Sequence, residues 1–283
     1  MKIIKSTVSL RKELNRQREE NLSIGLVPTM GNIHEGHLKL VEAAAKSCDY
    51  IVATIFVNPL QFGPNEDLQC YPRTMEEDSE KLKKTGCHCL FAPSEKELFG
   101  MNLTSQTTVH IPLLSEKYCG QTRPGHFDGV ATVVCKIFNI VNPDIAFFGL
   151  KDYQQFLIIQ KLVKDLGFPL KVVGIEVVRD QNGLALSSRN NFLSAEQLKI
   201  ATNVNRCLTN AKNNIMAGLK EFRSIEQQSL EKMYSAGLKP EYFSICHAYS
   251  LEPAEKNDLE LVILTAVYLG SIRLIDNVRI SLN

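Results

Sequence analysis

Tryptophan is absent from the 283 residues, aromatic residues make up only 7% of the chain, and neither sign of charge is in excess. Lys and Arg number 32 against 31 for Asp and Glu, so the net charge of +1 provides no general attraction to nucleic acid or to an anionic membrane. The longest clearly apolar run, residues 261–269, is about half of the ~20 residues that a membrane helix needs. We therefore expect no nucleic-acid partner and no membrane segment, and any anion site must be local.

Eight cysteines are present, without a repeated spacing, in a chain far longer than a disulfide miniprotein. This pattern favours reduced thiols, and the amino end lacks the continuous apolar region of a secretory signal. We expect a cytoplasmic protein. Cys87, His88 and Cys89 match no common zinc spacing, so buried or surface cysteines are favoured over a metal site there.

Apolar runs typical of strands alternate with stretches of helical periodicity through the first two thirds of the chain. The predicted strands are residues 22–28, 50–57, 89–92, 144–148 and 170–178, and the predicted helices are 36–48, 74–85, 130–141 and 153–166. This alternation predicts an α/β fold with a mostly parallel sheet and helices on both faces.

The pattern of apolar and polar residues changes from about residue 193. Longer polar helices are expected at 195–219 and 225–236, followed by short strands at 242–248 and 261–268. This predicts a smaller α+β domain at the carboxyl end. We place the domains at residues 1–180 and 181–283, with the boundary inside 179–191.

Chemistry is expected in the loops that follow the strands, because open α/β sheets bind ligands outside the carboxyl ends of their strands. The first such loop contains His34 and His37, which lie three residues apart and therefore on one face at the start of a helix. Gly36 lets a ligand approach the backbone. A helix amino end favours anions, so this loop is typical of a polyphosphate site.

Other interpretations of the histidine pair can be compared with this one. A zinc protease would need His-Glu-x-x-His, whereas the second histidine comes three residues after the first, so that motif fails on spacing. The chain has neither a Gly-x-x-x-x-Gly-Lys-[Ser/Thr] nor a Gly-x-Gly-x-x-Gly loop, so a nucleotide would bind by another route. A purely structural role, in which the histidines cap and pack the helix start, stays open at this point.

Three further strand-end loops carry polar side chains. Gln61 offers donors and acceptors in a loop rich in Pro, Gly and Asn. Lys151 starts a helix and can reach phosphate, with Gln155 one helical turn beyond it. Ser187, Ser188 and Arg189 can clamp phosphates near the domain boundary. Each loop alone is weak, but four of them at strand carboxyl ends indicate one ligand site.

Five segments, in order, resemble the motifs of the pantoate–β-alanine ligase family. They are residues 28–37 (PTMGNIHEGH), 56–62 (FVNPLQF), 123–132 (RPGHFDGVAT), 148–155 (FGLKDYQQ) and 187–190 (SSRN). The resemblance is strong over about residues 1–200. The His-x-x-His and Ser-Ser-Arg elements also resemble, more loosely, the signatures of other adenylyl-forming nucleotidyltransferases.

The family resemblance implies a Rossmann-like amino-terminal domain that binds ATP and pantoate, a smaller carboxyl-terminal lid, and a homodimer. It implies an Mg²⁺-dependent ligase reaction in pantothenate and coenzyme A biosynthesis. ATP and pantoate would give pantoyl adenylate and pyrophosphate, and the amine of β-alanine would then release AMP and form pantothenate.

The same resemblance assigns roles to individual residues. His37, His34, Lys151 and Arg189 are the implied catalytic residues. Gln61 and Gln155 are the implied pantoate-binding residues, and Gln61 is also implied to bind β-alanine. The implied ATP contacts are Met30, Gly31, Asn32, Ile33, His34, Glu35, Gly36, His37, Gly149, Leu150, Lys151, Asp152, Val178, Leu186, Ser187, Ser188 and Arg189. No side chain is predicted as a direct Mg²⁺ ligand, and the roles of Arg123 and His126 stay open.

One departure concerns Leu150, where the family usually has Glu. If the glutamate carboxylate only orients its neighbours, its replacement changes ligand affinity. If the carboxylate serves metal or ribose binding, its replacement lowers activity. Because every phosphate-facing residue is retained, we expect an active enzyme. The alternatives are a nucleotidyltransferase of the same superfamily and a nucleotide-binding protein with impaired catalysis.

Overall fold

The computed structural model describes residues 1–64 and 66–282, and the chain forms two compact units. The first comprises Met1–Leu150 and Gln154–Glu176, and the second comprises Lys151–Tyr153 and Val177–Asn283. Two hydrogen bonds explain why the short segment 151–153 joins the second unit. The side-chain amide of Asn277 donates to the carbonyl oxygen of Lys151 at 2.9 Å, and the Tyr153 hydroxyl donates to the carbonyl oxygen of Ala248 at 3.0 Å.

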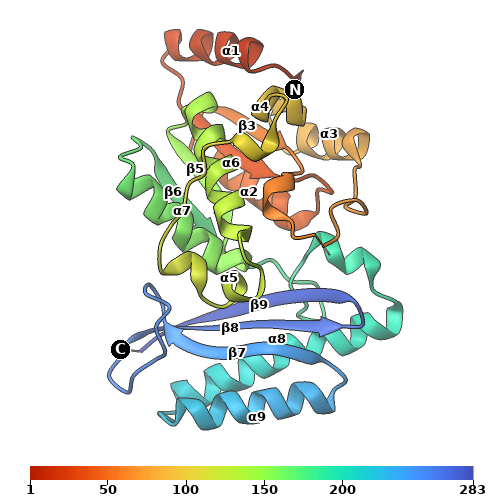
Figure 1. Ribbon diagram of the computed structural model, residues 1–283, viewed down its shortest axis with the longest axis vertical. Coiled ribbons are helices and arrows are strands. Elements are labelled where there is room, and N and C mark those ends of the chain that lie inside the picture. The colour runs from red at the N-terminus through yellow and green to blue at the C-terminus, as the bar shows by residue number, and fades with distance from the viewer. Residues whose placement is uncertain (65, 283) are drawn as a thin grey trace. The chain divides into compact units, whose positions relative to one another are not determined.

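A parallel sheet of six strands, in the order β1-β4-β3-β2-β5-β6, forms the centre of the first unit (Figure 1). Its strands are β1 (Lys2–Ile4), β2 (Ile24–Thr29), β3 (Tyr50–Ile55), β4 (Cys89–Phe91), β5 (Ile145–Gly149) and β6 (Lys171–Ile175). Apart from the short edge strand β1, the order is that of a Rossmann-like sheet. The chain adds β3 and β4 on one side of β2, and then β5 and β6 on the other side.

Helices connect these strands and cover both faces of the sheet. They are α1 (Thr7–Glu19), α2 (Glu35–Ala45), α3 (Met75–Lys84), α4 (Glu95–Phe99), α5 (Cys119–Thr122), α6 (His126–Val141) and α7 (Tyr153–Asp165). Short 3₁₀ turns lie at Pro59–Gln61, Leu103–Ser105, Leu114–Glu116 and Leu150–Asp152.

Two adjacent residues of β5 show how both faces are filled. Phe147 belongs to a buried cluster with Leu40 and Val41 of α2. The next residue, Phe148, packs edge-on against Phe138 of α6, with 6.3 Å between ring centroids. Since successive side chains of a strand point to opposite faces, α2 and α6 lie on opposite sides of the sheet.

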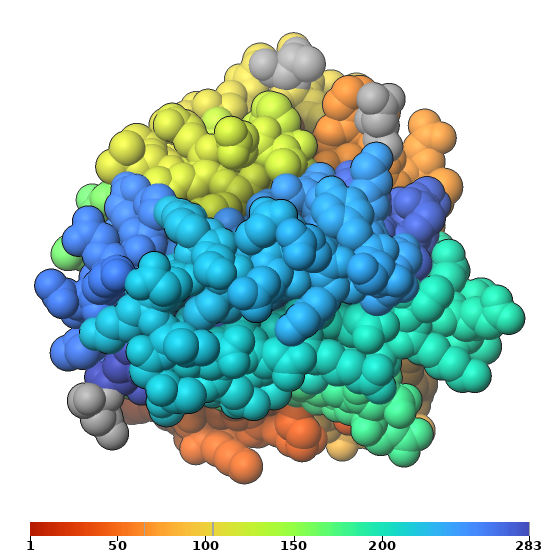
Figure 2. Space-filling model, turned by 90° about the horizontal axis from the view of Figure 1, so that it is seen from below, coloured from red at the N-terminus to blue at the C-terminus, as the bar shows by residue number. Residues whose placement is uncertain are grey.

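In the second unit a three-stranded antiparallel sheet packs against two long helices. The strands β7 (Lys239–His247), β8 (Glu260–Leu269) and β9 (Ile272–Ser281) follow in that order across the sheet. Its helices are α8 (Ala195–Met216) and α9 (Phe222–Ser235), with a 3₁₀ turn at Ser188–Phe192. Buried side chains such as Leu208, Met233 and Ile263 form the shared core. Figure 2 looks onto the surface that α8 and α9 form, shown in cyan and light blue.

The expected fold class is confirmed, with the parallel sheet in the first unit and the smaller α+β arrangement after it. Several elements differ from expectation. β1, α1, α4 and α5 have no counterpart among the predicted elements. Three further differences have a visible physical reason. β6 ends at Ile175 rather than 178, because the Val178 carbonyl oxygen accepts instead from the Leu186 amide. α6 starts at His126 rather than 130, directly after Gly125 in the left-handed region. β9 has no counterpart among the predicted strands, because Asp276 and other polar residues interrupt its apolar pattern.

Candidate active site

The sheet topology marks one place where a ligand crevice is expected. The chain leaves β2 toward β3 on one side, whereas it leaves the neighbouring strand β5 toward β6 on the other side. Loops that diverge in this way open a crevice outside the carboxyl ends of the strands. The predicted ATP loop starts here after Thr29, and the predicted nucleotide-lining segment starts at Gly149.

The loop after β2 turns the chain sharply into α2. Gly31 has a φ of 88° and Asn32 a φ of 50°, so two successive residues occupy the left-handed region. A Cβ at Gly31 would also lie 3.1 Å from Oδ2 of Asp78 and 3.2 Å from a methyl carbon of Ile55. Both the backbone angle and the available space therefore favour glycine at this position.

Asp78 on α3 anchors this loop. Its fully buried carboxylate accepts from the amide of Asn32 at 2.8 Å, from the amide of Ile33 at 2.7 Å and from the Thr74 hydroxyl at 3.1 Å. One helical turn further on, Nζ of Lys81 donates to the carbonyl oxygen of Ile33 at 2.9 Å. The sequence pattern does not point to Asp78 or Lys81, because both stand among several charged residues in an otherwise solvent-like helix.

His34 and His37 are brought together at the start of α2. Their rings stack with 4.0 Å between centroids and 28° between planes. The His34 amide donates to Nδ1 of His37 at 3.4 Å. Because Nδ1 accepts, the neutral form of His37 carries its proton on Nε2, where it can be donated to a ligand.

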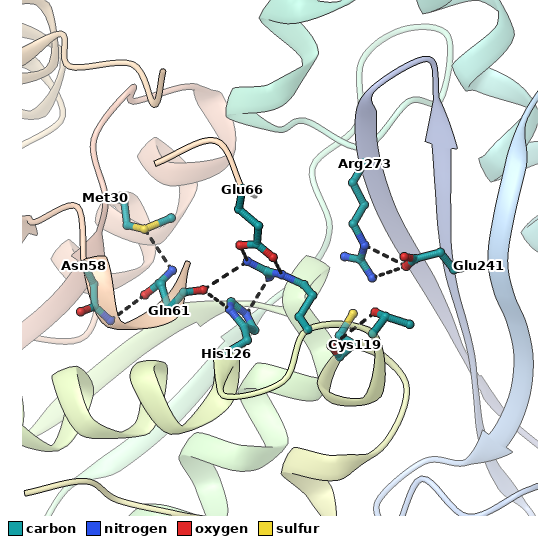
Figure 3. Close-up of polar contacts among 10 residues, drawn as sticks. Met30, Asn58, Gln61, Glu66, Cys119, His126, Glu241 and Arg273 are labelled. Atoms are coloured by element: carbon teal, nitrogen blue, oxygen red, sulfur yellow. Dashed lines mark hydrogen bonds and ion pairs between the residues drawn. The ribbon is translucent and has the colours of Figure 1, made fainter. Parts of the chain in front are cut away.

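Gln61 lies on the 3₁₀ turn after β3 and is almost buried (Figure 3). Asn58 fixes the orientation of its amide: Nδ2 of Asn58 donates both to Oε1 of Gln61 and to the carbonyl oxygen of Gly129, each at 3.0 Å. Nε2 of Gln61 then points to Sδ of Met30, at 3.1 Å. The predicted pantoate residue is thus in direct contact with the first residue of the predicted ATP loop.

Two adjacent glutamines of the 148–155 motif have different environments. Gln154 is buried, and its amide donates to the carbonyl oxygens of Leu114 at 2.8 Å and Lys117 at 2.7 Å. Its Oε1 accepts from the Cys119 amide at 3.2 Å. Gln155, the residue predicted for pantoate, is half-buried on the same helix.

Leu150 directs its side chain into the core of the first unit and is 3% exposed. A Cβ on Gly174 of β6 would lie 2.5 Å from Cδ2 of Leu150 and 3.0 Å from Cζ of Phe156. The position that usually holds Glu in the family is therefore filled here by an apolar contact with β6.

The remaining predicted residues belong to the second unit. Val178 and Leu186 are neighbours through the 2.9 Å backbone hydrogen bond, at the base of a turn closed by a bridge between Arg179 and Ala185. Nζ of Lys151 lies 3.9 Å from the Asp152 carboxylate. The other three predicted residues, Ser187, Ser188 and Arg189, lie together at the start of the 3₁₀ turn before α8.

Cys87 and Cys89 are buried in the first unit. Burial raises the pKa of Cys87 to about 11 and that of Cys89 to about 12, so both thiols stay protonated at neutral pH. Nδ1 of His88 accepts from the amide of Ile51 at 3.0 Å. These contacts belong to packing of the sheet.

Within residues 1–64 and 66–282, no three His, Cys, Asp or Glu side chains gather as a candidate metal-binding group. In the same part of the chain no helix combines the length and the apolar character needed to cross a lipid bilayer.

Comparison with known proteins extends over nearly the whole chain. The pantothenate synthetase of Pseudomonas fluorescens (strain Pf0-1) is 48% identical over 283 residues, covering 100% of this chain and 99% of that protein. The solved pantothenate synthetase of Thermus thermophilus matches with a TM-score of 0.92 at 39% identity, covering 98% of this chain and 99% of that one.

A third relative, the pantoate-beta-alanine ligase of Francisella tularensis, was solved in complex with beta-gamma ATP and β-alanine. It matches with a TM-score of 0.83 at 32% identity, over 98% of this chain and 97% of that one. The family model described as pantoate-beta-alanine ligase matches residues 2–279. With full-length relatives of this similarity, the chain belongs to the pantoate–β-alanine ligase family.

Proposed function

We propose that this protein is a pantothenate synthetase, which joins pantoate to β-alanine with ATP. In the first step a carboxylate oxygen of pantoate attacks the α-phosphorus of ATP, and pyrophosphate leaves. In the second step the amine of β-alanine attacks the acyl carbon of pantoyl adenylate, loses a proton, and displaces AMP. Full-length similarity to proteins that carry this name supports the proposal.

The contact between Gln61 and Met30, at 3.1 Å, is the observation on which the geometric support rests. Adenylate formation requires the carboxylate of the acid beside the α-phosphate, and holding two reactants in contact is a large part of catalysis. A pantoate held by Gln61 would lie next to the loop that starts at Met30. The proposed pantoate and ATP positions are therefore adjacent in the first unit.

The histidine pair supplies donors for the phosphates in this proposal. Negative charge grows on the phosphoryl oxygens and on the departing pyrophosphate, so fixed donors there lower the barrier. The amides of Asn32 and Ile33 already donate to Asp78. The donors proposed for the phosphates are the rings of His34 and His37 and the first amides of α2, with Nε2 of His37 as the proposed acid.

Gln61 is well suited to bind a hydroxy acid. Its Nε2 donates to the thioether sulfur of Met30, and a thioether is a weak acceptor. A carboxylate or hydroxyl oxygen of pantoate is a stronger acceptor and would take its place. The proposal assigns pantoate to Gln61 and Gln155, and β-alanine to Gln61 in the second step.

Residues around the end of β5 and in the second unit complete the proposed set of ATP contacts. Gly149, Leu150, Lys151 and Asp152 would line the nucleotide, with Lys151 on the phosphates and Leu150 contributing its backbone, because its side chain is buried. Val178 would contact adenine, and the triphosphate would be bound by Leu186, Ser187, Ser188 and Arg189. These assignments rest on the motif resemblance, and Lys151 and Arg189 bring the positive charge that a triphosphate requires.

Mg²⁺ fits the proposed reaction as the cation bound to ATP. Mg²⁺ prefers oxygen ligands and commonly keeps substrate phosphates among them. The first unit presents imidazoles and amides at this loop, and its buried carboxylate Asp78 is engaged with backbone amides. We therefore assign Mg²⁺ to the phosphate oxygens of ATP, whose negative charge it would neutralise. A cytoplasmic homodimer is also part of the proposal.

The test supplies ATP, Mg²⁺, pantoate and β-alanine and follows AMP and pyrophosphate together. The proposal predicts one AMP and one pyrophosphate for each pantothenate formed. Pyrophosphate without AMP would indicate a nucleotidyltransferase, and nucleotide binding without turnover would indicate a protein with impaired catalysis.

A variant tests the role of His37. His37→Ala should lower the rate of adenylate formation by about 100-fold, as other losses of a transition-state donor do. His110→Ala is the control, because the side chain of that histidine is 49% exposed and pairs with Asp128 on the surface. Adenylate formation at the full rate in His37→Ala would remove this residue from the mechanism.

A further inference from the structure

The backbone carbonyl oxygen of Gln61 is contacted by two side chains that the proposed chemistry does not use (Figure 3). Nδ1 of His126 lies 2.7 Å from this oxygen, and a guanidinium nitrogen of Arg123 donates to it at 3.3 Å. Both residues come from the 123–132 motif, at the start of α6. They approach Gln61 from a segment 62 or more residues further along the chain.

Arg123 is itself held by Glu66. Nε and Nη2 of the guanidinium donate to the two carboxylate oxygens, each at 2.6 Å, so the pair is bidentate. The side chains are 15% and 24% exposed. Burial raises the pKa of Glu66, but the hydrogen bonds and charge of Arg123 outweigh it and hold the pKa below its usual value. The pair is thus ionised at neutral pH, and its fork geometry fixes the guanidinium.

The hydrogen bonds determine the tautomer of His126. Nη1 of Arg123 lies 2.9 Å from Nε2 of His126. Arginine has no acceptor, so Nε2 must accept and carries no proton. The proton of the neutral ring is then on Nδ1, which donates it to the carbonyl oxygen of Gln61. A guanidinium and a ring N–H together fix one backbone oxygen.

The other side of Gln61 is fixed as well. Asn58 holds its side-chain amide, and α6 comes so close at Gly129 that a Cβ there would overlap the backbone of Leu60 and Gln61. The backbone of Gln61 is thus clamped between Gly129 and the Arg123–His126 pair. A shift of that backbone would move the amide that is proposed to bind pantoate.

We propose that Glu66, Arg123 and His126 are positioning residues that hold Gln61 in the orientation that binds pantoate. This inference rests on the proposed function of Gln61. It assigns a specific consequence to the network: its loss weakens pantoate binding and leaves ATP binding intact, since the ATP loop is held by Asp78 and Lys81 on α3.

Three substitutions of His126 separate its two hydrogen bonds. Asparagine keeps an N–H donor near the place of Nδ1, glutamine keeps an acceptor near the place of Nε2, and leucine keeps neither. If the bond to Gln61 is what matters, the KM for pantoate should rise roughly tenfold in His126→Leu and His126→Gln. In His126→Asn it should stay within about threefold of the wild-type value. The KM for ATP should change less than about twofold in all three.

Arg123→Lys tests whether the planar, bidentate geometry of the guanidinium is required. An ammonium group cannot contact Glu66, His126 and Gln61 in the same fixed arrangement, so the KM for pantoate should again rise roughly tenfold. Arg273→Lys is the matched control. Arg273 pairs with Glu241 in the second unit at 2.7 Å, and these side chains are 15% and 18% exposed. The same exchange there should leave both KM values unchanged.

A spectroscopic measurement checks the tautomer without turnover. In ¹⁵N NMR of the wild-type protein, Nδ1 of His126 should show the shift of a protonated ring nitrogen and Nε2 that of an unprotonated one, and Arg123→Lys should change the Nε2 signal. Unchanged pantoate KM values in an active enzyme would overturn the positioning role, as would equal effects of asparagine and leucine. An inactive wild-type protein would instead refute the proposed function itself.

Discussion

Replacing Asp78 by asparagine tests whether the ATP loop depends on an anchor outside it. Asparagine has the same shape, but one of its two terminal atoms is an NH₂ group. That group would face an amide N–H that now donates to a carboxylate oxygen at 2.7 or 2.8 Å. A hydrogen bond to a charged group contributes about 1.5–3 kcal/mol. One such bond is lost and the other weakened, so the free energy of unfolding should fall by about 2–4 kcal/mol.

The functional effect follows from the backbone of the loop. Asn32 occupies the left-handed region, which costs about 1–2 kcal/mol for most residues with a side chain and less for asparagine, and the surroundings help to hold it there. Without the Asp78 carboxylate, the loop that presents His34 and His37 loses this restraint. We expect the KM for ATP to rise by about tenfold or more, because roughly 1.4 kcal/mol corresponds to a factor of ten.

Thermal unfolding and steady-state kinetics check both parts. The fall in stability should lower the Tm by about 4–16 °C, at roughly 2–4 °C for each kcal/mol in a protein of this size. Asp165→Asn is the control, because its carboxylate is 44% exposed and pairs with Lys161 on the surface of α7. Such pairs contribute about 0.5 kcal/mol or less, so this variant should match the wild type in both assays. An unchanged Tm and ATP KM in Asp78→Asn would refute the anchor.

Two further predictions concern the core and the Glu66 pair. Gly174→Ala should lower the free energy of unfolding by about 1–3 kcal/mol through overlap with Leu150, and Leu150→Ala should lower it by about 2–5 kcal/mol through a cavity. Denaturant unfolding of the double variant should show at least about 1 kcal/mol less destabilisation than the sum, and simple additivity would contradict the shared space. The pKa of Glu66 in the folded protein lies below its usual value of 4.5. Its ion pair with Arg123 therefore stabilises the fold fully above about pH 4.5, and this contribution is lost as the pH falls through the folded pKa. The Tm difference between the wild type and Glu66→Gln should therefore be constant from pH 7 to about 5 and shrink below pH 4.5; a difference that persists at about pH 2 would count against the ion pair.

Local sequence patterns predicted the elements whose pattern comes from burial. β2, β3 and β5 are apolar runs because both of their faces are covered, and such runs are easily detected. β9 escapes detection for the opposite reason: it carries Arg273, Asp276 and Asn277, and the last two are buried through partners on other segments. A strand that hides polar groups by tertiary hydrogen bonds has no local signature.

The same distinction applies to the candidate site. His34, His37 and Gln61 stand in recognisable loops, so the sequence points to them directly. Asp78 holds its loop from 45 or more residues away, and Glu66 acts on Gln61 only through Arg123, 57 residues further along the chain. Nothing in their own segments sets these two residues apart from solvated carboxylates. Residues that bind a ligand can be recognised by type and loop position, whereas residues that hold the binding groups are visible only once the chain is folded.

The two glutamines of the 148–155 motif show why even a strong motif needs the fold to be interpreted. Adjacent positions on a helix point about 100° apart, so one side chain can face a ligand while the other faces the interior. The side-chain amide of Gln154 bonds to the backbone of residues 114–119, where Tyr118 has a φ of 42°. A buried amide that satisfies three backbone groups stabilises this irregular segment and leaves Gln155 as the proposed partner for a ligand. The pair thus combines one structural residue with one proposed ligand-binding residue, and exchanging their roles would require α7 to rotate by a full residue step.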